Sequence, residues 1–246
     1  AGGYSYTKST YEVEIDITPD TVAHFERVAF STETPVPEIR YTLDGSTPSP
    51  SSLLYHDPFT LATSSEIRAL AFRGGIALGS PTGKSVTFHL GSYKPVRYDL
   101  PYSNKYTGGG PYCLTDGLRG STLYNDGRWQ GYLEGDLQVT IDLGDSVSVE
   151  KISCGFLENP GVYIFFPSSV AYLVSLDGVQ FDTVGTTAPT FGSEKRDLAK
   201  KDLAVVFPRR KARYIRVDAK NIGTVPQGYK GEGEPAWIFA DEVIVR

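Results

Sequence analysis

Short stretches in which apolar and polar residues alternate recur along this chain, and they constrain its fold more than any other feature. Residues 12–17 alternate acidic side chains with Val or Ile, and residues 39–43 repeat the rhythm before Asp44-Gly45. Successive residues of a strand point to opposite faces, so this period of two places the apolar side chains on one face. An Asp-Gly pair after such a stretch is typical of a β-hairpin turn. The pattern predicts half-buried strands joined by tight turns, for which the 26 Gly and 16 Pro residues are well suited.

The same rhythm divides the chain into two parts. It stops at the joint 91–95, which contains glycine and proline, and restarts at residues 137–143. We therefore expect an all-β protein of two domains, over residues 11–91 and 92–246, each of them a β-sandwich. Only residues 193–203 are expected to form a short helix, which their many charges would place on the surface.

The charge balance argues against several classes of function. With 24 basic and 29 acidic residues the net charge is −5, which is unfavourable for binding to nucleic acid or to an anionic membrane. The longest uncharged stretch, residues 159–176, is interrupted by prolines, so no membrane-spanning segment is expected. The chain contains no Met and begins with Ala1-Gly2-Gly3, which predicts a fragment of a longer protein.

The chain has two cysteines, Cys113 and Cys154, too few for a disulfide framework. Cys154 alternates with Ile152 and Phe156, which favours a position inside a core. Two buried free thiols are the favoured interpretation. A disulfide that closes the 113–154 loop stays open as the alternative, and it would require an oxidising compartment.

The first domain contains a specific run of motifs. These are Ile39-Arg-Tyr-Thr-Leu-Asp-Gly-Ser-Thr-Pro48, Ser52-Leu-Leu-Tyr55, Pro58-Phe59 and Ile67-Arg-Ala-Leu-Ala-Phe72. With them, residues 12–90 resemble the immunoglobulin/fibronectin-like C-terminal domain that follows the barrel of bacterial family 20 β-hexosaminidases, or chitobiases. The resemblance implies a non-catalytic sandwich that acts as packing or as a spacer.

Six further motifs follow one another in the second domain. They are Thr115-Asp-Gly117, Asp126-Gly-Arg-Trp-Gln-Gly-Tyr132, Val139-Thr-Ile-Asp-Leu-Gly144, Val174-Ser-Leu-Asp-Gly178, Ala212-Arg-Tyr-Ile-Arg-Val217 and Ala236-Trp-Ile-Phe-Ala-Asp-Glu-Val-Ile-Val245. With them, residues 95–246 resemble the discoidin domain, also called the coagulation factor 5/8 C-type or galactose-binding-like domain. Its bacterial sugar-binding members are family 32 carbohydrate-binding modules. The resemblance implies a jelly-roll β-sandwich, and its order behind the first module implies the tail of a secreted or periplasmic family 20 enzyme whose catalytic barrel lies outside these 246 residues.

The second resemblance also implies a structural metal ion. In discoidin-like modules a cation, usually calcium, ties the start of the domain to its end. The implied ligands are the side chains of Asp116, Ser121 and Glu242 and the backbone carbonyls of Cys113, Leu118 and Asp241. Six hard oxygen donors suit Ca²⁺ rather than zinc. The alternative is that Asp116 only caps the turn before Gly117 and that Glu242 is solvated.

No active site is expected. The pair Asp241-Glu242 matches the adjacent Asp-Glu of family 20 hydrolases, but it lies in a strand-like run, so the two side chains should point to opposite faces. The three histidines, His24, His56 and His89, have neither metal-ligand spacing nor a Ser-His-Asp setting. The sequence therefore predicts a fragment that is not an enzyme.

Sugar binding requires aromatic faces that stack on pyranose rings and polar groups that reach hydroxyls. The candidates in or beside Gly- and Pro-rich segments are Asn125, Arg128, Trp129, Tyr132, Glu158, Tyr163, Phe165, Tyr229 and Trp237. Tyr163 and Phe165 are expected to share one exposed face by the period of two, whereas Trp129 and Trp237 are equally compatible with core packing.

The expected ligand is a glycan with galactose, GalNAc or GlcNAc at its end. Gly228-Tyr229 stands where hexosaminidase-linked members often have Trp-His, which predicts a different ligand choice or a loss of binding. The alternative function is a structural buttress that packs on the parent enzyme's catalytic barrel and binds no sugar. In either case the resemblance places the parent outside the cytoplasm.

Overall fold

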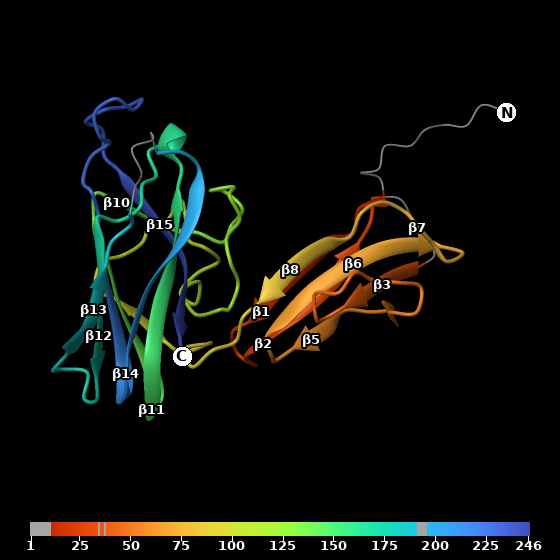
Figure 1. Cartoon of the computed structure of the whole chain (residues 1–246), viewed down its shortest axis with the longest axis horizontal. Coiled ribbons are helices and arrows are strands. Elements are labelled where there is room, and N and C mark those ends of the chain that lie inside the picture. Colours follow the sequence, from red (N-terminus) through yellow and green to blue (C-terminus); the bar gives the residue numbers. More distant parts are fainter. Residues whose placement is uncertain (1–10, 34, 37, 191–195) are drawn as a thin grey trace. The chain divides into compact units, whose positions relative to one another are not determined.

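The computed structural model describes residues 11–33, 35–36, 38–190 and 196–246. Every ladder between its strands is antiparallel, and these residues form no α-helix, so the predicted all-β class is confirmed. In the same residues there is no helix long and apolar enough to cross a membrane. The chain forms two compact units, Ala1–Phe88 and His89–Arg246, so the division falls after residue 88 rather than after residue 91 (Figure 1).

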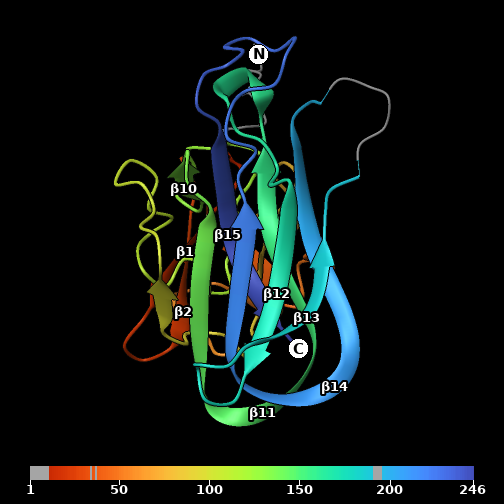
Figure 2. The ribbon, with the colours of Figure 1, turned by 90° about the vertical axis from the view of Figure 1, so that its left-hand side faces the viewer.

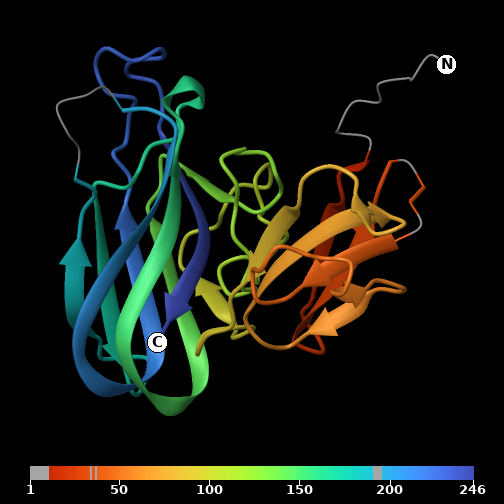
Figure 3. The same cartoon turned by 45° about the vertical axis from the view of Figure 1, so that its right-hand side comes forward.

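The first unit consists of two packed sheets, one with the strand order β1-β2-β5 and one with the order β4-β3-β6-β7, in which β8 also pairs with β6 (Figure 3). The strands are β1 (Glu14–Asp20), β2 (Phe25–Ser31), β3 (Glu38–Thr42), β4 (Leu53–Leu54), β5 (Phe59–Leu61), β6 (Ser65–Arg73), β7 (Ile76–Ala77) and β8 (Thr82–Val86). Alternation sets the core, because β1 buries Ile15 and Ile17 while Glu14 and Asp16 stay exposed. The ring of Phe30 on β2 lies 5.3 Å from that of Tyr41 on β3, which joins the two sheets.

The second unit is built around two very long strands. Its strands are β9 (Val96–Tyr98), β10 (Gln130–Leu133), β11 (Leu137–Glu158), β12 (Ser169–Ser175), β13 (Asp182–Thr187), β14 (Ala199–Lys220) and β15 (Trp237–Val245). β11 and β14, with 22 residues each, pair along their whole length, but the register shifts between Asp142 and Val147 and again between Val149 and Lys151. These irregularities bend the two-stranded ribbon, as Figure 2 shows.

The bend allows one ribbon to belong to two layers. The first half of β11 pairs with β9, and the second half of β14 pairs with β12, which continues to β13. The second half of β11 pairs with β15, which continues to β10. The apolar core fills the space between the layers, with the side chains of Val139, Ile152 and Val243 all fully buried. The second unit is therefore a β-sandwich.

One sequence prediction of secondary structure is wrong. Residues 199–203 begin β14 instead of ending a helix, and residues 191–195 lie outside the described residues. The physical reason is tertiary, because the stretch pairs with residues 154–158 of β11, and this pairing outweighs the helix preference of its charged residues. Both cysteines are free and buried, as the favoured interpretation held.

Loops from distant parts of the sequence meet at one end of this sandwich. β11 ends at Glu158, and the chain then forms a short 3₁₀ turn over Pro160–Val162. The long loop 221–236, between β14 and β15, rises at the same end (Figure 2). An isolated bridge between Ile164 and Trp237 ties the two segments together.

Candidate functional site

A cleft lined by aromatic side chains opens beside the Pro160–Val162 turn. It has a volume of about 320 Å³ and is lined by Lys105, Tyr106, Tyr124, Gly161, Val162, Tyr163, Ile164, Trp237 and Phe239. We call it the aromatic cleft. The ring of Tyr106 lies edge-on to Trp237 at 5.3 Å and to Tyr124 at 6.1 Å. These three rings and Tyr163 are only partly buried, so they remain accessible from the solvent.

A buried apolar cluster forms the floor under these rings. Trp129, Leu157, Ile164 and Phe239 pack together, and Tyr106, Tyr124 and Trp237 pack against them. The indole N–H of Trp129 donates to the carbonyl of Ser121 at 3.1 Å, so the hydrogen-bonding group of this buried ring has a partner inside the protein. The accessible rings thus rest on a packed base that limits their movement.

Tyr163 is held by its backbone and by its ring. It has φ of 67° and ends the 3₁₀ turn, in the left-handed region that non-glycine residues rarely adopt. Its carbonyl accepts the N–H of Trp237 at 2.9 Å, which fixes it beside β15. Its ring lies so close to Gly231 that a Cβ there would be 2.4 Å from a ring carbon. Tyr163 therefore links the turn to the 221–236 loop.

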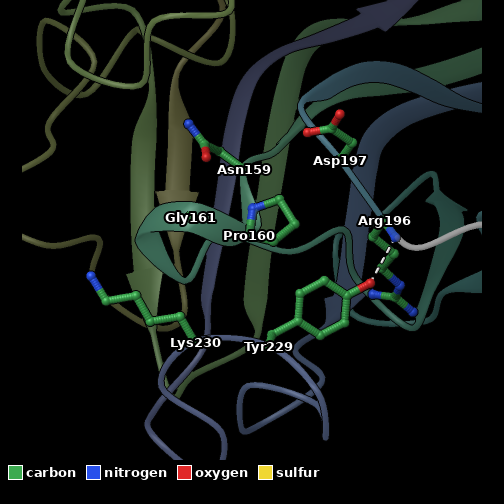
Figure 4. A pocket seen from close by; sticks show the side chains of 7 residues that line it. All are labelled: Asn159, Pro160, Gly161, Arg196, Asp197, Tyr229 and Lys230. Carbon is green, nitrogen blue, oxygen red and sulfur yellow. Dashed lines mark hydrogen bonds between the residues drawn. The ribbon is translucent and has the colours of Figure 1, made fainter.

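A second hollow lies on the other side of the same turn. It has a volume of about 450 Å³ and is lined by Asn159, Pro160, Gly161, Arg196, Asp197, Tyr229 and Lys230 (Figure 4). We call it the polar pocket. The hydroxyl of Tyr229 accepts the backbone N–H of Arg196 at 2.7 Å, and the Tyr229 ring packs edge-on against Phe165 at 5.5 Å. These contacts fix the Tyr229 ring as one wall of the pocket.

Beneath the polar pocket lies an ion pair. Arg196 donates from Nη1 to Glu158 Oε1 at 3.3 Å, and its guanidinium lies 5.8 Å from the centre of the Phe165 ring. The same carboxylate oxygen accepts the N–H of Phe166 at 3.3 Å. Burial raises the pKa of Glu158 despite these favourable partners. Glu158 thus orients Arg196 from below.

The structure brings together only some of the residues predicted to bind sugar. Tyr163 and Trp237 line the aromatic cleft and Tyr229 lines the polar pocket. Neither Asn125 nor Arg128 lines either hollow. Asn125 is exposed on the 121–128 loop, and Arg128 Nη1 lies 4.0 Å from Asp116 Oδ2.

Three predicted stacking residues and one polar residue are buried instead. Trp129 and Tyr132 are 2% exposed, Phe165 is 0% exposed and Glu158 is 2% exposed, so none of them presents a face to a ligand. The expected shared face of Tyr163 and Phe165 is wrong, because the segment turns at Tyr163 and does not continue as a strand. The hydroxyl of Tyr132 donates inward to Gln130 Oε1 at 3.0 Å.

Several lining residues were not predicted from the sequence. They are Lys105, Tyr106, Tyr124, Asn159, Arg196, Asp197 and Lys230. The available signal for two of them was an aromatic residue close to glycines, since Tyr106 precedes Gly108 and Tyr124 precedes Gly127. Their placement in the cleft depends on loop geometry, which has no sequence period.

The residues implied as metal ligands lie where two distant segments meet. The N–H of Gly117 donates to Glu242 Oε2 at 2.9 Å, and the N–H of Val243 donates to the carbonyl of Leu114 at 2.9 Å. The Cys113 thiol lies 3.7 Å from the Asp241 carbonyl oxygen. The segments 113–118 and 241–243 are therefore held side by side, whereas Ser121 lies on the exposed loop that follows, where its hydroxyl accepts the N–H of Leu123.

His89, for which the sequence predicts no site, contacts Glu242. Its Nδ1 accepts the backbone N–H groups of Gly91 at 3.0 Å and Val245 at 3.3 Å, so the ring proton resides on Nε2. Nε2 therefore donates to Glu242 Oε1, 2.8 Å away. Burial lowers the pKa of His89 to about 4, so the ring is neutral at pH 7.

By their chemistry, the implied donors suit a hard divalent cation. Asp116 and Glu242 are both buried, and burial together with the charge of Asp116 raises the pKa of Glu242. A cation between them would relieve this repulsion, and carboxylate and carbonyl oxygens are the ligands that calcium prefers. Within the described ranges, no three His, Cys, Asp or Glu side chains form a metal-binding group, which leaves the implied site dependent on carbonyl and hydroxyl oxygens.

The adjacent residue Asp241 has different partners from Glu242. Its Oδ2 accepts Arg119 Nε at 2.8 Å and the N–H of Gly120 at 3.0 Å. Arg119 also contacts Asp202 on β14. The two neighbouring carboxylates of β15 thus serve separate networks, as the strand geometry predicts.

A comparison with protein families found a match within the first unit. Residues 17–82 match the family model described as the chitobiase/beta-hexosaminidase C-terminal domain, which confirms the resemblance predicted for the first unit. No curated protein matches the chain.

Several solved carbohydrate-binding modules are similar to part of the chain. One is chitosan-binding module 1 from the chitosanase/glucanase of Paenibacillus sp. IK-5, with 20% identity, 64% of this chain and 98% of that chain covered, and a TM-score of 0.43. Chitosan-binding module 2 of that enzyme, in complex with chitotriose, has 18% identity, 64% and 98% coverage and a TM-score of 0.41. A CBM32 module from Clostridium perfringens, in complex with GalNAc-β-1,3-galactose, has 17% identity, 61% and 92% coverage and a TM-score of 0.39.

Proposed function

We propose that the second unit binds carbohydrate in the aromatic cleft and serves a larger glycoside hydrolase as a non-catalytic accessory module. The observation that supports this most directly is the cleft itself, in which Tyr106, Tyr124, Tyr163 and Trp237 are partly exposed around a buried apolar floor. Rings of this kind offer a rigid apolar face to the C–H groups of a pyranose while their polar atoms stay hydrated.

In this proposal, the parent enzyme of the module is a β-N-acetylhexosaminidase that acts outside the cytoplasm. The family match of residues 17–82 supports this choice, because that module is named for chitobiases and β-hexosaminidases. The expected ligands are glycans that end in galactose, GalNAc or GlcNAc. Asp241 and Glu242, the adjacent carboxylates, are fully buried, which supports a role other than hydrolysis for them.

Binding by a shallow cleft of this size should be weak. We expect dissociation constants on the order of 0.1–1 mM, or about −4 to −5.5 kcal/mol. Such an affinity is useful when the module is covalently linked to a catalytic domain, because the linkage raises the effective concentration of the enzyme near its substrate.

A structural Ca²⁺ forms part of the same proposal. Asp116, Glu242 and the carbonyls of residues 113, 118 and 241 would hold it, with the Ser121 hydroxyl completing the set. The ion would supply positive charge to the buried carboxylates and fix the 113–121 loop against β15. Gly117 and His89 already orient Glu242 by donating to its two oxygens.

A titration followed by NMR tests the binding proposal. The full chain would be titrated with galactose, GalNAc, GlcNAc and chitooligosaccharides, with calcium present and after EDTA. Saturable shifts at Trp237 and Tyr163 are expected, and Tyr124→Ala should abolish them. The matched control is Tyr214→Ala, since Tyr214 is also partly buried but lies against Gly178, outside both hollows. A folded protein without shifts across the panel would refute sugar binding and favour a buttress that packs on the catalytic barrel.

A further inference from the structure

The aromatic cleft and the polar pocket are two sides of one surface feature. Both are lined by Gly161, and the turn Pro160–Val162 separates them. The same two segments, the turn and the 221–236 loop, build both hollows, because Tyr163 borders the cleft and Tyr229 borders the pocket. A ligand that crosses Gly161 would contact both.

Gly161 lines both hollows. Its φ lies outside the left-handed region, so the backbone does not require glycine at this position. A Cβ there would approach only Asn159 Oδ1, at 3.4 Å, and the residue is exposed. A larger side chain would therefore be accepted by the fold at a position that lines both hollows.

The chemistry of the polar pocket differs from that of the cleft. It offers the Asn159 amide, the exposed Lys230 ammonium and the exposed Asp197 carboxylate, while the Arg196 guanidinium is paired with Glu158. Figure 4 shows these groups around the rings of Tyr229 and Pro160. The pocket thus contains a donor, an acceptor and charges of both signs. A sugar hydroxyl can both donate and accept, so this mixture suits a neutral, hydroxyl-rich group better than an anion.

We propose that one neutral oligosaccharide of at least two sugar units binds across Gly161, with one unit on the rings of the aromatic cleft and the next in the polar pocket. This inference rests on the proposed function and adds the length and charge class of its ligand. The first unit stacks on the rings. The second unit makes hydrogen bonds to Asn159, Asp197 and Lys230.

Calorimetry on the full chain tests this arrangement with two ligand series, GlcNAc with its β-1,4-linked dimer and trimer, and galactose with lactose. The disaccharide of the bound series should bind about tenfold more tightly than the monosaccharide, which corresponds to one or two added hydrogen bonds. Asn159→Ala should reduce the disaccharide affinity to that of the monosaccharide and leave the monosaccharide affinity unchanged. Gly161 lines both hollows, so Gly161→Gln should weaken the disaccharide more than the monosaccharide. The matched control is Lys211→Ala, which alters a basic residue that lines a different hollow.

The possible outcomes separate this inference from the function on which it rests. If the monosaccharide and the disaccharide bind equally, or if Asn159→Ala weakens both to the same extent, the two-hollow arrangement is refuted while sugar binding stands. A glucuronic acid-containing disaccharide that binds more tightly than its neutral counterpart refutes the charge class. If no sugar of either series binds to the folded protein, both proposals fail.

Discussion

Replacing Gly231 by Ala should displace Tyr163, and the chain contains a nearly ideal control for this change. Gly231 and Gly233 lie in the same loop with φ of 82° and 83°, so Ala imposes the same backbone strain at both positions. They differ in their surroundings, because a Cβ on Gly231 meets the Tyr163 ring at 2.4 Å, whereas a Cβ on Gly233 meets nothing within 4 Å. Any difference between the two variants therefore reports the contact with Tyr163.

The expected magnitudes follow from these two terms. A left-handed conformation costs an alanine about 1–2 kcal/mol, which both variants should lose from the free energy of unfolding. Overpacking adds about 1–3 kcal/mol for Gly231→Ala, toward the lower end if the Tyr163 ring rotates away. For a domain of this size each kcal/mol lowers Tm by about 2–4 °C. Rotation of the ring would also remove it from the aromatic cleft, so sugar affinity should fall in Gly231→Ala only.

Tryptophan fluorescence provides a suitable assay. Both tryptophans of the chain, Trp129 and Trp237, lie in the second unit, so thermal or urea unfolding followed by this signal reports that unit alone. The double variant Gly231→Ala/Tyr163→Ala should remove the overpacking term, leaving a cost close to that of Gly233→Ala. Equal stabilities and equal sugar affinities for Gly231→Ala and Gly233→Ala would refute the reasoning.

Three further predictions concern Asp241 and Glu242 on β15 and the side chains that contact them. His89 should contribute stability that is lost as the pH falls from 6.5 to 4, because its unfolded ring binds a proton near 6.5 and the folded ring only near 4. Glu158 and Glu242 have raised pKa values and act in the opposite direction, so the His89 contribution is measured as the difference between the unmodified protein and His89→Gln in a pH series of urea titrations. That difference should approach about 3 kcal/mol between pH 6.5 and pH 4. Removal of calcium with EDTA should lower both the Tm and the free energy of unfolding of the second unit. The free energy should fall by about 2.7 kcal/mol when the free calcium concentration before EDTA is a hundredfold above its Kd. Glu242→Gln should abolish this response, and an unchanged Tm would contradict the metal proposal. Arg119→Ala should cost about 3–5 kcal/mol because it leaves the fully buried Asp241 without its cation, whereas Arg209→Ala, which breaks an exposed pair with Glu150, should cost at most about 1 kcal/mol in the same titrations.

Alternation predicted the strands well because it reports a property of each strand by itself. Ile15 and Ile17, or Val139 and Ile141, are buried on one face wherever the partner strands come from. The stretch 199–203 was assigned to a helix because its charges hide this pattern. Its strand conformation comes from pairing with residues 154–158, more than forty positions earlier in the sequence.

The candidate site was harder to predict because loops build it. The period of two correctly placed Tyr163 at the site but wrongly predicted that Phe165 is exposed, because the chain turns at Tyr163 just before it. Tyr106 reaches the cleft on a loop held by an isolated bridge between Thr107 and Gln130 and by the N–H of Gly131, which donates to the Tyr106 carbonyl at 3.0 Å. Such placements depend on contacts between segments that are distant in sequence, and no local pattern encodes them.

The first and last residues of the second unit are attached to each other. The N–H of Leu90 donates to the carbonyl of Val245 at 3.1 Å, and the N–H of Val245 donates back to the His89 ring. The polypeptide therefore enters and leaves this unit at neighbouring points, away from the loop end that contains the cleft and the pocket. A domain with adjacent ends can be inserted into a surface loop of an unrelated protein, or circularly permuted through a new peptide link, with little change to its interior. This geometry makes the unit suited to transfer as a block from one host protein to another.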